Sequence, residues 1–370
     1  MSTVIEIAEQ LKATKENIIL IYAFNATGKT RLSVEYKNIT KVKEDGRHIG
    51  VYYNAFSEDL FVWDNDNDNG EQNIKLDIKF SSLNRLHTLM TEEDVEKKLI
   101  PYKRKYNFYF NPNADPEKGY DSVTFYKIED TESKTPIKIS RGEERIFVWC
   151  FFLALLEVEG WADTQNAHFF IDDPVSSLDD HNIYVTAYTV FDLILKEYEK
   201  RKIIITSHHF GFLTILSDML GKGEYVSKFR NRDNSKKYKE FILEGNGDEL
   251  SLIKTRDGVF LYHLRLLQIL NQAKDSKEVY TYHFALLRQV LENIASFLGV
   301  GQFGYVLEQI GITDPQRVAF IVNALSHLNV YYQQIDKPVP DNLELFNEVL
   351  ERLMTKYRFV IPKEESDNDK

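Results

Sequence analysis

The stretch HFFIDDPVSSLDD, residues 168–180, decides how this chain folds. Its apolar run FFI, residues 169–171, is typical of a buried parallel strand. Asp172 and Asp173 follow where the strand should end, at the edge where open α/β sheets bind phosphates and their metal. We therefore expect Asp172 to hold Mg²⁺, directly or through water, and Asp173 to orient a water for attack on a γ-phosphate. Taken alone, the stretch could equally be a strand that ends in a solvated acidic turn.

A phosphate-binding loop is predicted near the N-terminus. The apolar, β-prone run NIILIYA, residues 17–23, leads directly into AFNATGKT, residues 23–30, and a helix is expected next. This is the order of strand, loop and helix that a P-loop requires. Lys29 would reach the β and γ oxygens, and the Thr30 hydroxyl would ligate Mg²⁺. The residues expected to bind the nucleotide are Ala23, Phe24, Asn25, Ala26, Thr27, Gly28, Lys29, Thr30 and Arg31.

Two alanines depart from the glycine-rich pattern of such loops. Ala23 replaces the first glycine of the motif, and Ala26 stands at a second position that often carries glycine. A methyl group in a tight anion-binding loop could narrow the pocket or slow turnover. Because Gly28, Lys29 and Thr30 are intact, we expect nucleotide binding and leave the hydrolysis rate open.

Two further motifs follow in the chain. ISRGEE, residues 139–144, precedes a long apolar helix expected over 145–158, and Ser140 and Gly142 at a helix start form a natural anion site. An isolated motif of this kind is more often an ordinary helix N-cap. The run KIIIT, residues 202–206, predicts another buried strand, which places His208 just after a strand end.

These four elements, in this order, resemble the ABC-type ATPases, with Ser177-Leu178-Asp179 as their D-loop. The resemblance implies that Ser140, Gly142 and Glu143 contact a γ-phosphate held by a partner head. It also implies that His208 hydrogen-bonds the γ-phosphate and acts with Asp173 in hydrolysis. Asn54 and Glu58, in the loop over residues 52–66, are further candidates for sensing the phosphate and the metal. A transporter ATPase subunit would fit the same motifs, but it would not explain the C-terminal third of the chain.

About 110 residues separate Thr30 from Ser140. This leaves no room for the long coiled coil of the chromosome-maintenance ATPases. Alternating residues at 106–110 and 122–127 predict antiparallel strands in this interval. The acidic stretch at residues 64–73 lacks the downstream glutamate of a calcium-binding EF-hand loop, so a surface loop is expected there.

Composition indicates a folded protein of about two domains. The chain has 370 residues, of which 43% are hydrophobic, and no apolar run approaches the ~20 residues of a membrane span. The N-terminus lacks signal-peptide features, and the single cysteine, Cys150, lies in an apolar run. We expect a reduced, cytoplasmic protein without a membrane partner.

The net charge of −11 argues against a chain built to coat nucleic acid. One local exception is the segment 222–239, which has seven basic and two acidic residues interleaved with Tyr225, Phe229 and Tyr238. It is the best candidate for contact with a phosphate backbone. The alternative is a solvated hairpin beside the ATPase core.

The pattern of the C-terminal third predicts helices over 261–274, 278–298, 303–310, 315–328 and 342–357. We therefore expect two domains: an α/β P-loop head at 1–245 and a mainly helical domain at 246–370. In the second helix, Arg288 and Glu292 are spaced i,i+4 and project from one face. His327 closes the motif NALSH on another helix and could converge with them. Otherwise the pair is an ordinary surface ion pair worth a few tenths of a kcal/mol.

Four stretches, IYAFNATGKTRLS, YYNAFSEDLFVWDND, FIDDPVSSLDD and YHFALLRQVLENIASFLG, resemble the PrrC anticodon nucleases over residues 20–330. The resemblance implies an ABC-type regulatory head and a C-terminal domain that cleaves tRNA in the anticodon loop. The family's catalytic Arg, Glu and His fall on Arg288, Glu292 and His327, and an anticodon-recognising aspartate falls on Asp257 across an alignment gap. The C-terminal helices also resemble HEPN ribonucleases, although Val322 stands where that motif has arginine; Arg288 could supply the cation.

This chemistry would need no metal at the RNA site. His327 suits general acid or base catalysis, Arg288 would bind the phosphate, and Glu292 would act as base or orient Arg288. The expected products are a 2′,3′-cyclic phosphate and a 5′-hydroxyl, from a tRNA-Lys-type substrate. The head would bind ATP or GTP, with dTTP as a further candidate, together with Mg²⁺.

The resemblance also predicts how the protein is organised and used. We expect a homodimer or dimer of dimers through the heads, serving antiphage defence. A type I restriction–modification complex would hold it silent until infection. The alternative is an ABC-type ATPase whose C-terminal helices bind a DNA or protein partner without cleaving RNA.

Overall fold

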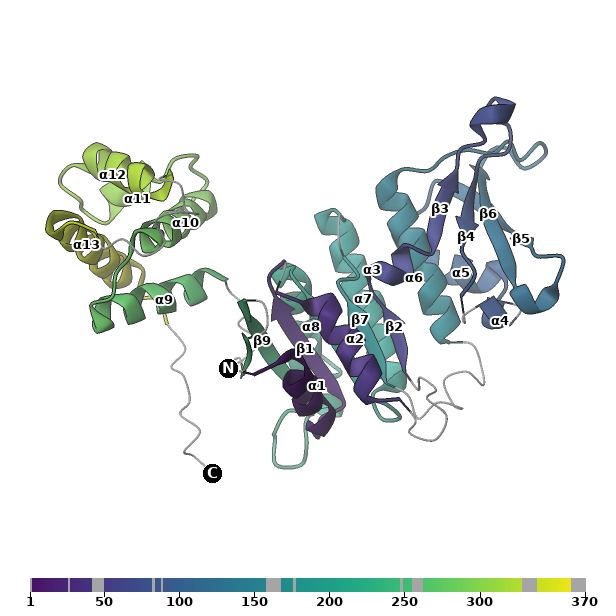
Figure 1. The fold of residues 1–370 in the computed structure, drawn as a ribbon, viewed down its shortest axis with the longest axis horizontal. Coiled ribbons are helices and arrows are strands. Elements are labelled where there is room, and N and C mark those ends of the chain that lie inside the picture. The colour runs from purple at the N-terminus through teal and green to yellow at the C-terminus, as the bar shows by residue number, and fades with distance from the viewer. Residues whose placement is uncertain are drawn as a thin grey trace. The chain divides into compact units, whose positions relative to one another are not determined.

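The computed structural model of the chain describes residues 2–25, 27–41, 50–81, 84–87, 89–157, 168–175, 178–246, 249–254, 262–327 and 338–360. It contains two compact units, Met1–Phe260 and Leu261–Lys370 (Figure 1). The boundary lies later than the expected 245/246 because β10 (Glu249–Lys254) pairs antiparallel with β9 (Tyr238–Asn246). The residues after 245 therefore first complete the sheet of the N-terminal unit, and the helices begin only after it.

A six-stranded sheet forms the centre of the first unit. Its strand order is β10-β9-β1-β8-β7-β2, and every neighbouring pair except β9 and β10 is parallel. The strands β1, β8 and β7 are buried along their whole length, as expected for a parallel sheet covered on both faces. The remaining strands of this sheet are β1 (Ile18–Ala23), β2 (Val51–Tyr53), β7 (Phe169–Asp172) and β8 (Ile203–Ser207).

Alternate residues of β1 enter two different hydrophobic clusters. Ile19 and Ile21 pack in a cluster with apolar residues of α1 (Val4–Ala13) and α2 (Lys29–Ile39). Ile18 and Leu20 pack in the cluster that includes α7 (Asp180–Glu197) and α8 (Phe210–Gly221). Because successive side chains of a strand point to opposite faces, helices cover the sheet on both sides.

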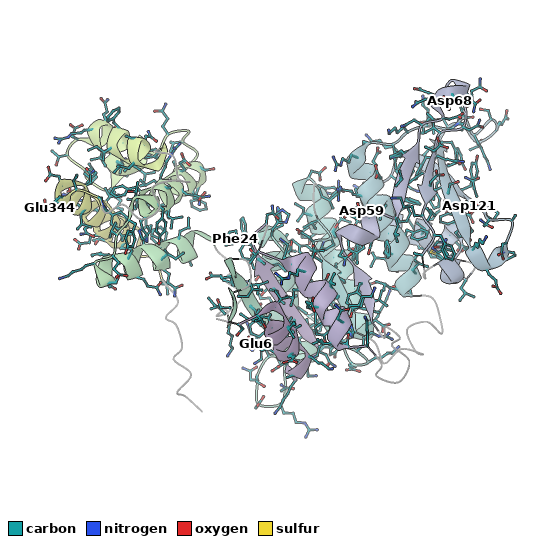
Figure 2. All side chains as sticks on the ribbon, viewed as in Figure 1. Glu6, Phe24, Asp59, Asp68, Asp121 and Glu344 are labelled. Atoms are coloured by element: carbon teal, nitrogen blue, oxygen red, sulfur yellow. The ribbon has the colours of Figure 1, made fainter. Side chains whose placement is uncertain are left out.

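A second, antiparallel sheet of four strands has the order β3-β4-β6-β5. The expected alternation at 106–110 and 122–127 is confirmed as the pairing of β5 with β6. The acidic stretch at 64–73 is an exposed turn, in which Figure 2 labels Asp68. The strands are β3 (Phe61–Asp64), β4 (Lys75–Ile78), β5 (Tyr106–Pro112) and β6 (Tyr120–Lys127).

The apolar helix α6 (Arg141–Leu156) lies between the two sheets. The ring of Trp149 contacts Tyr53 of β2 at 5.0 Å, and the ring of Phe147 contacts Phe125 of β6 at 4.9 Å. A helix that is apolar on all sides must be buried on all sides, which explains the composition of this segment. Cys150 is fully buried in it, which confirms its place in the core.

Short elements complete the first unit: α3 (Ala55–Glu58), α4 (Asn84–His87), α5 (Glu92–Leu99), η1 (Asn67–Asn69), η2 (Ile100–Tyr102), η3 (Pro116–Lys118) and η4 (Val226–Phe229). The second unit has a hydrophobic core of its own. Its helices are α9 (Tyr262–Ser276), α10 (Thr281–Phe297), α11 (Gly304–Gln309), α12 (Pro315–His327) and α13 (Pro340–Tyr357). Within the described residues, no helix is long and apolar enough to cross a membrane.

Two buried histidines should make folding stability depend on pH. Burial lowers the pKa of both His87 and His168 from 6.5 to about 4, and Lys202 and Lys12 add to the effect on His168. The neutral Nδ1 of His87 accepts a hydrogen bond from the backbone N–H of Tyr120 at 3.3 Å. Below pH 6.5 these histidines become protonated in the unfolded chain but stay neutral in the folded chain. The free energy of unfolding therefore decreases as the pH falls toward 4. Each histidine accounts for roughly 3 kcal/mol of this loss.

Urea unfolding between pH 7 and pH 4 would measure this dependence. Replacing His87 by Gln should make the free energy of unfolding less dependent on pH over this range. Replacing the exposed His181 by Gln should leave the dependence unchanged. An unaltered pH dependence in His87→Gln would refute the assignment.

Candidate functional site

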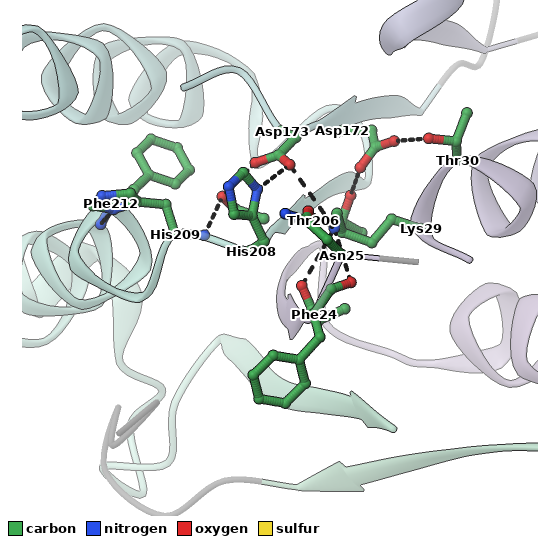
Figure 3. Close-up of polar contacts among 12 residues, drawn as sticks. Phe24, Asn25, Lys29, Thr30, Asp172, Asp173, Thr206, His208, His209 and Phe212 are labelled. Carbon is green, nitrogen blue, oxygen red and sulfur yellow. Dashed lines mark hydrogen bonds and ion pairs between the residues drawn. The ribbon is translucent and has the colours of Figure 1, made fainter. Parts of the chain in front are cut away.

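The predicted P-loop connects the end of β1 to the start of α2, as the sequence indicated. Gly28 caps α2 with a φ of +98°, a left-handed conformation that favours glycine. The buried ammonium of Lys29 folds back over the loop (Figure 3). It donates to the carbonyl oxygens of Ala23 and Phe24 at 3.3 and 3.1 Å and to Asn25 Oδ1 at 3.4 Å. The loop oxygens therefore fix the Lys29 ammonium in a position where it could contact a phosphate bound by the loop.

The structure changes the interpretation of Ala23. This residue ends β1, is fully buried and belongs to the same hydrophobic cluster as Ile19 and Ile21. Its methyl group therefore packs in the core of the unit, and its effect on the phosphate pocket stays a prediction. Ala26 lies outside the described residues.

Asp172 joins residues that are far apart in the sequence. Its Oδ2 accepts a hydrogen bond from Thr30 Oγ1 at 2.7 Å, and its Oδ1 accepts one from Thr206 Oγ1 at 2.6 Å. Burial raises the pKa of Asp172, while the two threonine hydroxyls counteract the rise. Carboxylate and hydroxyl oxygens are ligands that Mg²⁺ prefers, so Thr30 and Asp172 fit a nucleotide-bound Mg²⁺.

Asp173 has an unusual backbone and several partners. Its φ is +57°, and its N–H donates to the carbonyl oxygen of Thr206 at 2.8 Å. Its carboxylate accepts from Ser207 Oγ at 2.8 Å, contacts His208 Nδ1 and lies 3.9 Å from Lys29 Nζ. Burial raises the pKa of Asp173, but the hydrogen bond and charge of His208 and the charge of Lys29 outweigh it and lower the pKa below its usual value. The carboxylate is therefore kept ionised, as a group that orients a water must be.

Two hydroxyl groups of this site were not predicted. Thr206 and Ser207 each donate to one of the two aspartates, and both come from the end of β8, the neighbour of β7. The sequence signal was present, because Thr206 is the last residue of the predicted strand at 202–206 and Ser207 follows it directly. The second histidine, His209, has a different role: its Nδ1 accepts from the N–H of Phe212 and caps α8. Leu178 and Asp179 of the expected D-loop are described, and Asp179 caps α7; Ser177 lies outside the described residues.

The two candidate sensing residues have separate roles. Asn54 is buried and donates to Ser33 Oγ at 3.1 Å, so it supports the N-terminal part of α2, which follows the loop. Glu58 forms an ion pair with Arg145 of α6 and accepts from the Tyr53 hydroxyl at 3.1 Å. Burial raises the pKa of Glu58, and the negative charge of Asp173 adds to the rise. Glu58 thus lies near the acidic strand end and connects it to α6.

Replacing Arg145 by methionine should destabilise the fold by about 2–3 kcal/mol, because it leaves the largely buried Glu58 carboxylate without its cation. Adding Glu58→Gln should restore much of the loss. The exposed pair of Lys97 and Glu93 is a matched control, and Lys97→Met should cost much less stability because solvent screens this pair. Equal losses from Arg145→Met and Lys97→Met in thermal unfolding would contradict this expectation.

Ser140 and Glu143 form a capping box at the start of α6. Ser140 Oγ donates to Glu143 Oε2 at 2.7 Å, and the N–H of Glu143 donates back to Ser140 Oγ at 3.4 Å. The helix therefore begins at Arg141, earlier than the expected residue 145. Ser140 is exposed, and a methyl group at Gly142 would meet no atom within 4 Å. Ser140 and Glu143 therefore hydrogen-bond to each other. The residues that converge on one site are instead Lys29, Thr30, Asp172, Asp173 and His208.

The predicted nuclease residues lie in the second unit. Arg288 Nε donates to Glu292 Oε1 at 2.8 Å on α10, and their side chains are 25% and 47% exposed. Helix α12, which packs against α10, ends at His327. The side chain of His327, like Asp257, lies outside the described residues, so its convergence with Arg288 stays a prediction. Val322 is fully buried in the core, where an arginine would lose its contact with water.

Three comparisons relate this chain to known proteins. The family described as AAA domain matches residues 87–354. The Escherichia coli protein named anticodon nuclease is 32% identical over 366 residues, which cover 90% of this chain and 87% of that protein. A solved SMC head bound to the C-winged helix domain of ScpA aligns with 65% of this chain and 90% of that chain, at 9% identity and a TM-score of 0.33. The chain therefore belongs to the family of the anticodon nuclease, and it also belongs to the AAA domain family.

Proposed function

We propose that this protein is a nucleotide-regulated endoribonuclease that cleaves tRNA in the anticodon loop without a metal at the RNA site. The observation that carries the proposal is the relationship to the anticodon nuclease along 90% of the chain, including α10 and α12. We further propose a tRNA-Lys-type substrate and a role in antiphage defence, with a type I restriction–modification complex as the silencing partner. Asp257 is the proposed recognition residue.

Cleavage would proceed by attack of a ribose 2′-oxygen on the adjacent phosphorus. A base removes the 2′ proton, the bond to the 5′-oxygen breaks, and that oxygen leaves with a proton from an acid. His327 would perform one of these proton transfers. The Arg288 guanidinium would stabilise the dianionic phosphorane, and the 2.8 Å bond from its Nε to Glu292 favours an orienting role for Glu292. The products are a 2′,3′-cyclic phosphate and a 5′-hydroxyl.

The first unit would regulate this site through nucleotide binding. The P-loop would bind ATP, GTP or dTTP. Thr30 and Asp172 would hold Mg²⁺, which would neutralise phosphate charge. Asp173 would orient the attacking water. His208, which contacts Asp173, would hydrogen-bond the γ-phosphate. As an ABC-type head, the unit would dimerise so that Ser140, Gly142 and Glu143 reach the partner's nucleotide.

Incubation of the purified full-length chain with total tRNA tests this proposal. The protein is preloaded with nucleotide, and EDTA is then added to half of the reactions. Discrete tRNA halves in both, with 5′ ends that a polynucleotide kinase labels directly, would support metal-independent cleavage. Intact tRNA alongside nucleotide hydrolysis would favour an ATPase whose C-terminal helices only bind a DNA or protein partner.

Replacing Ser140 by arginine is expected to prevent nucleotide-dependent dimerisation of the heads. The side chain is exposed at the start of α6, so a larger cation there should leave the fold intact but clash with a closed partner head. Light scattering with and without Mg–nucleotide would measure the effect at micromolar concentration. A wild-type protein that stays monomeric with nucleotide present would refute head closure.

A further inference from the structure

A cluster of exposed tyrosines lies beside the basic segment at residues 222–239. Tyr184 and Tyr188 are spaced i,i+4 on α7 and are 55% and 56% exposed, and Tyr225 is 37% exposed. The ring of Tyr225 lies 5.9 Å from the ring of Phe191, which follows Tyr188 by three residues on α7, so Tyr225 lies beside the face of the helix that carries Tyr188. Exposed aromatic rings are the groups on which unpaired bases stack.

Four cations of the same segment have no carboxylate partner among the described residues: Lys228, Arg230, Arg232 and Lys237. The Lys228 ammonium lies 5.4 Å from the Tyr225 ring, and the Lys237 ammonium lies 5.9 Å from the Tyr198 ring. The acidic Asp233 instead accepts two hydrogen bonds from Ser235. The segment is therefore a local positive surface on a chain whose net charge is −11.

Aromatic contacts fix this segment to α7. Phe229 is fully buried and packs against Phe191 and Tyr198, with ring centroids 5.9 and 5.2 Å apart. Tyr225 meets the ring of Phe191 at 5.9 Å. The basic segment is therefore anchored beside the exposed tyrosines of α7. We call the two together the tyrosine–lysine surface: Tyr184, Tyr188, Tyr225, Lys228, Arg230, Arg232 and Lys237.

This surface does not overlap the nucleotide site. Its basic part leads into the amino end of β9, whereas the P-loop follows the carboxyl end of β1. Because β1 and β9 are parallel neighbours, these two ends lie on opposite edges of the sheet. Figure 1 shows the loop between α8 and β9, in teal, projecting from the edge at which β9 begins.

We propose that the tyrosine–lysine surface binds RNA, with the four cations on its phosphates and the tyrosines stacked on unpaired bases. Cations without carboxylate partners can bind phosphate without breaking an ion pair. Base stacking tolerates any sequence, so the surface would hold the RNA without selecting the cleavage position. That this RNA is the tRNA substrate rests on the proposed function.

Affinity of the full-length chain for tRNA, measured by fluorescence anisotropy from 50 to 200 mM salt, tests the proposal. Replacing the four cations by glutamine should lower the slope of log affinity against log salt by about 3, at about 0.7 for each cation. Replacing Tyr188 by alanine should weaken binding about five- to hundredfold and leave the slope unchanged. The matched control replaces four exposed lysines of the second sheet and its neighbouring loops, Lys103, Lys105, Lys118 and Lys127, and should have a much smaller effect.

Three outcomes decide between the possibilities. Weaker tRNA binding by both surface variants, with nucleotide-dependent stabilisation intact, supports the surface. Wild-type affinity and salt slope in the four-cation variant would overturn it, even if the wild-type protein cleaves tRNA and the proposed function stands. Tight binding of duplex DNA but not of tRNA by the wild-type protein would also overturn it. Cleavage itself tests the function separately from the surface.

Discussion

Replacing Lys29 by alanine is expected to remove most of the stabilisation that nucleotide confers on this protein. The Lys29 ammonium is buried and held by the loop oxygens of Ala23, Phe24 and Asn25, 3.9 Å from Asp173. A lost charge-assisted contact to phosphate costs roughly 1.5–3 kcal/mol, or about ten- to hundredfold in affinity. At a nucleotide concentration of 100 times the wild-type Kd, the stabilisation should fall from about 2.7 to about 0.4 kcal/mol at the upper end of this range.

Thermal unfolding with and without Mg–ATP, Mg–GTP or Mg–dTTP would measure this loss and reveal which nucleotide is preferred. Because Lys29 also neutralises Asp173, each variant must be compared with its own nucleotide-free form. Asn38→Ala is the control, since Asn38 is exposed at the far end of the same helix. A Lys29→Ala protein that nucleotide stabilises as strongly as wild type would reject this loop as the site.

The nucleotide site was predictable because its residues follow from local rules. A strand, a glycine-containing loop and a helix predict the P-loop, and two aspartates after an apolar run predict a strand end. Parallel strands place their carboxyl ends at one edge of a sheet, so Thr30 and Asp172 meet although 142 residues separate them. The hydroxyls of Thr206 and Ser207 follow from the same rule once β8 is placed beside β7.

Other features depend on contacts that no local pattern encodes. The ion pair of Glu58 with Arg145 joins α3 to α6 and requires both sheets to be in place. The direction of the Ala23 methyl group depends on the face of β1 that α1 and α2 cover. The strand β10 was instead missed despite a local signal, since the dipeptide Asn246-Gly247 is typical of a tight hairpin turn.

Replacing His327 by alanine is expected to lower the rate of tRNA cleavage by about 10²–10⁴-fold, while nucleotide hydrolysis continues. Arg288→Ala should lose about 10²–10³-fold, because it removes the cation that would stabilise the dianionic phosphorane. Residues that act as one catalytic unit lose activity non-additively, so the double variant Arg288→Ala/His327→Ala should be little worse than either single variant. Single-turnover cleavage of a purified tRNA would measure all three rates.

The alternative for Arg288 and Glu292 is an ordinary surface ion pair, and it predicts a different result. In that case Glu292→Ala would cost a few tenths of a kcal/mol and leave cleavage intact. The pair of Arg352 and Glu348 on α13 is the matched control, since it has the same i,i+4 spacing and similar exposure. Glu348→Ala should therefore change neither cleavage nor hydrolysis. Full cleavage by His327→Ala would place the nuclease site elsewhere, whereas loss in Glu292→Ala but not in Glu348→Ala would assign it to α10.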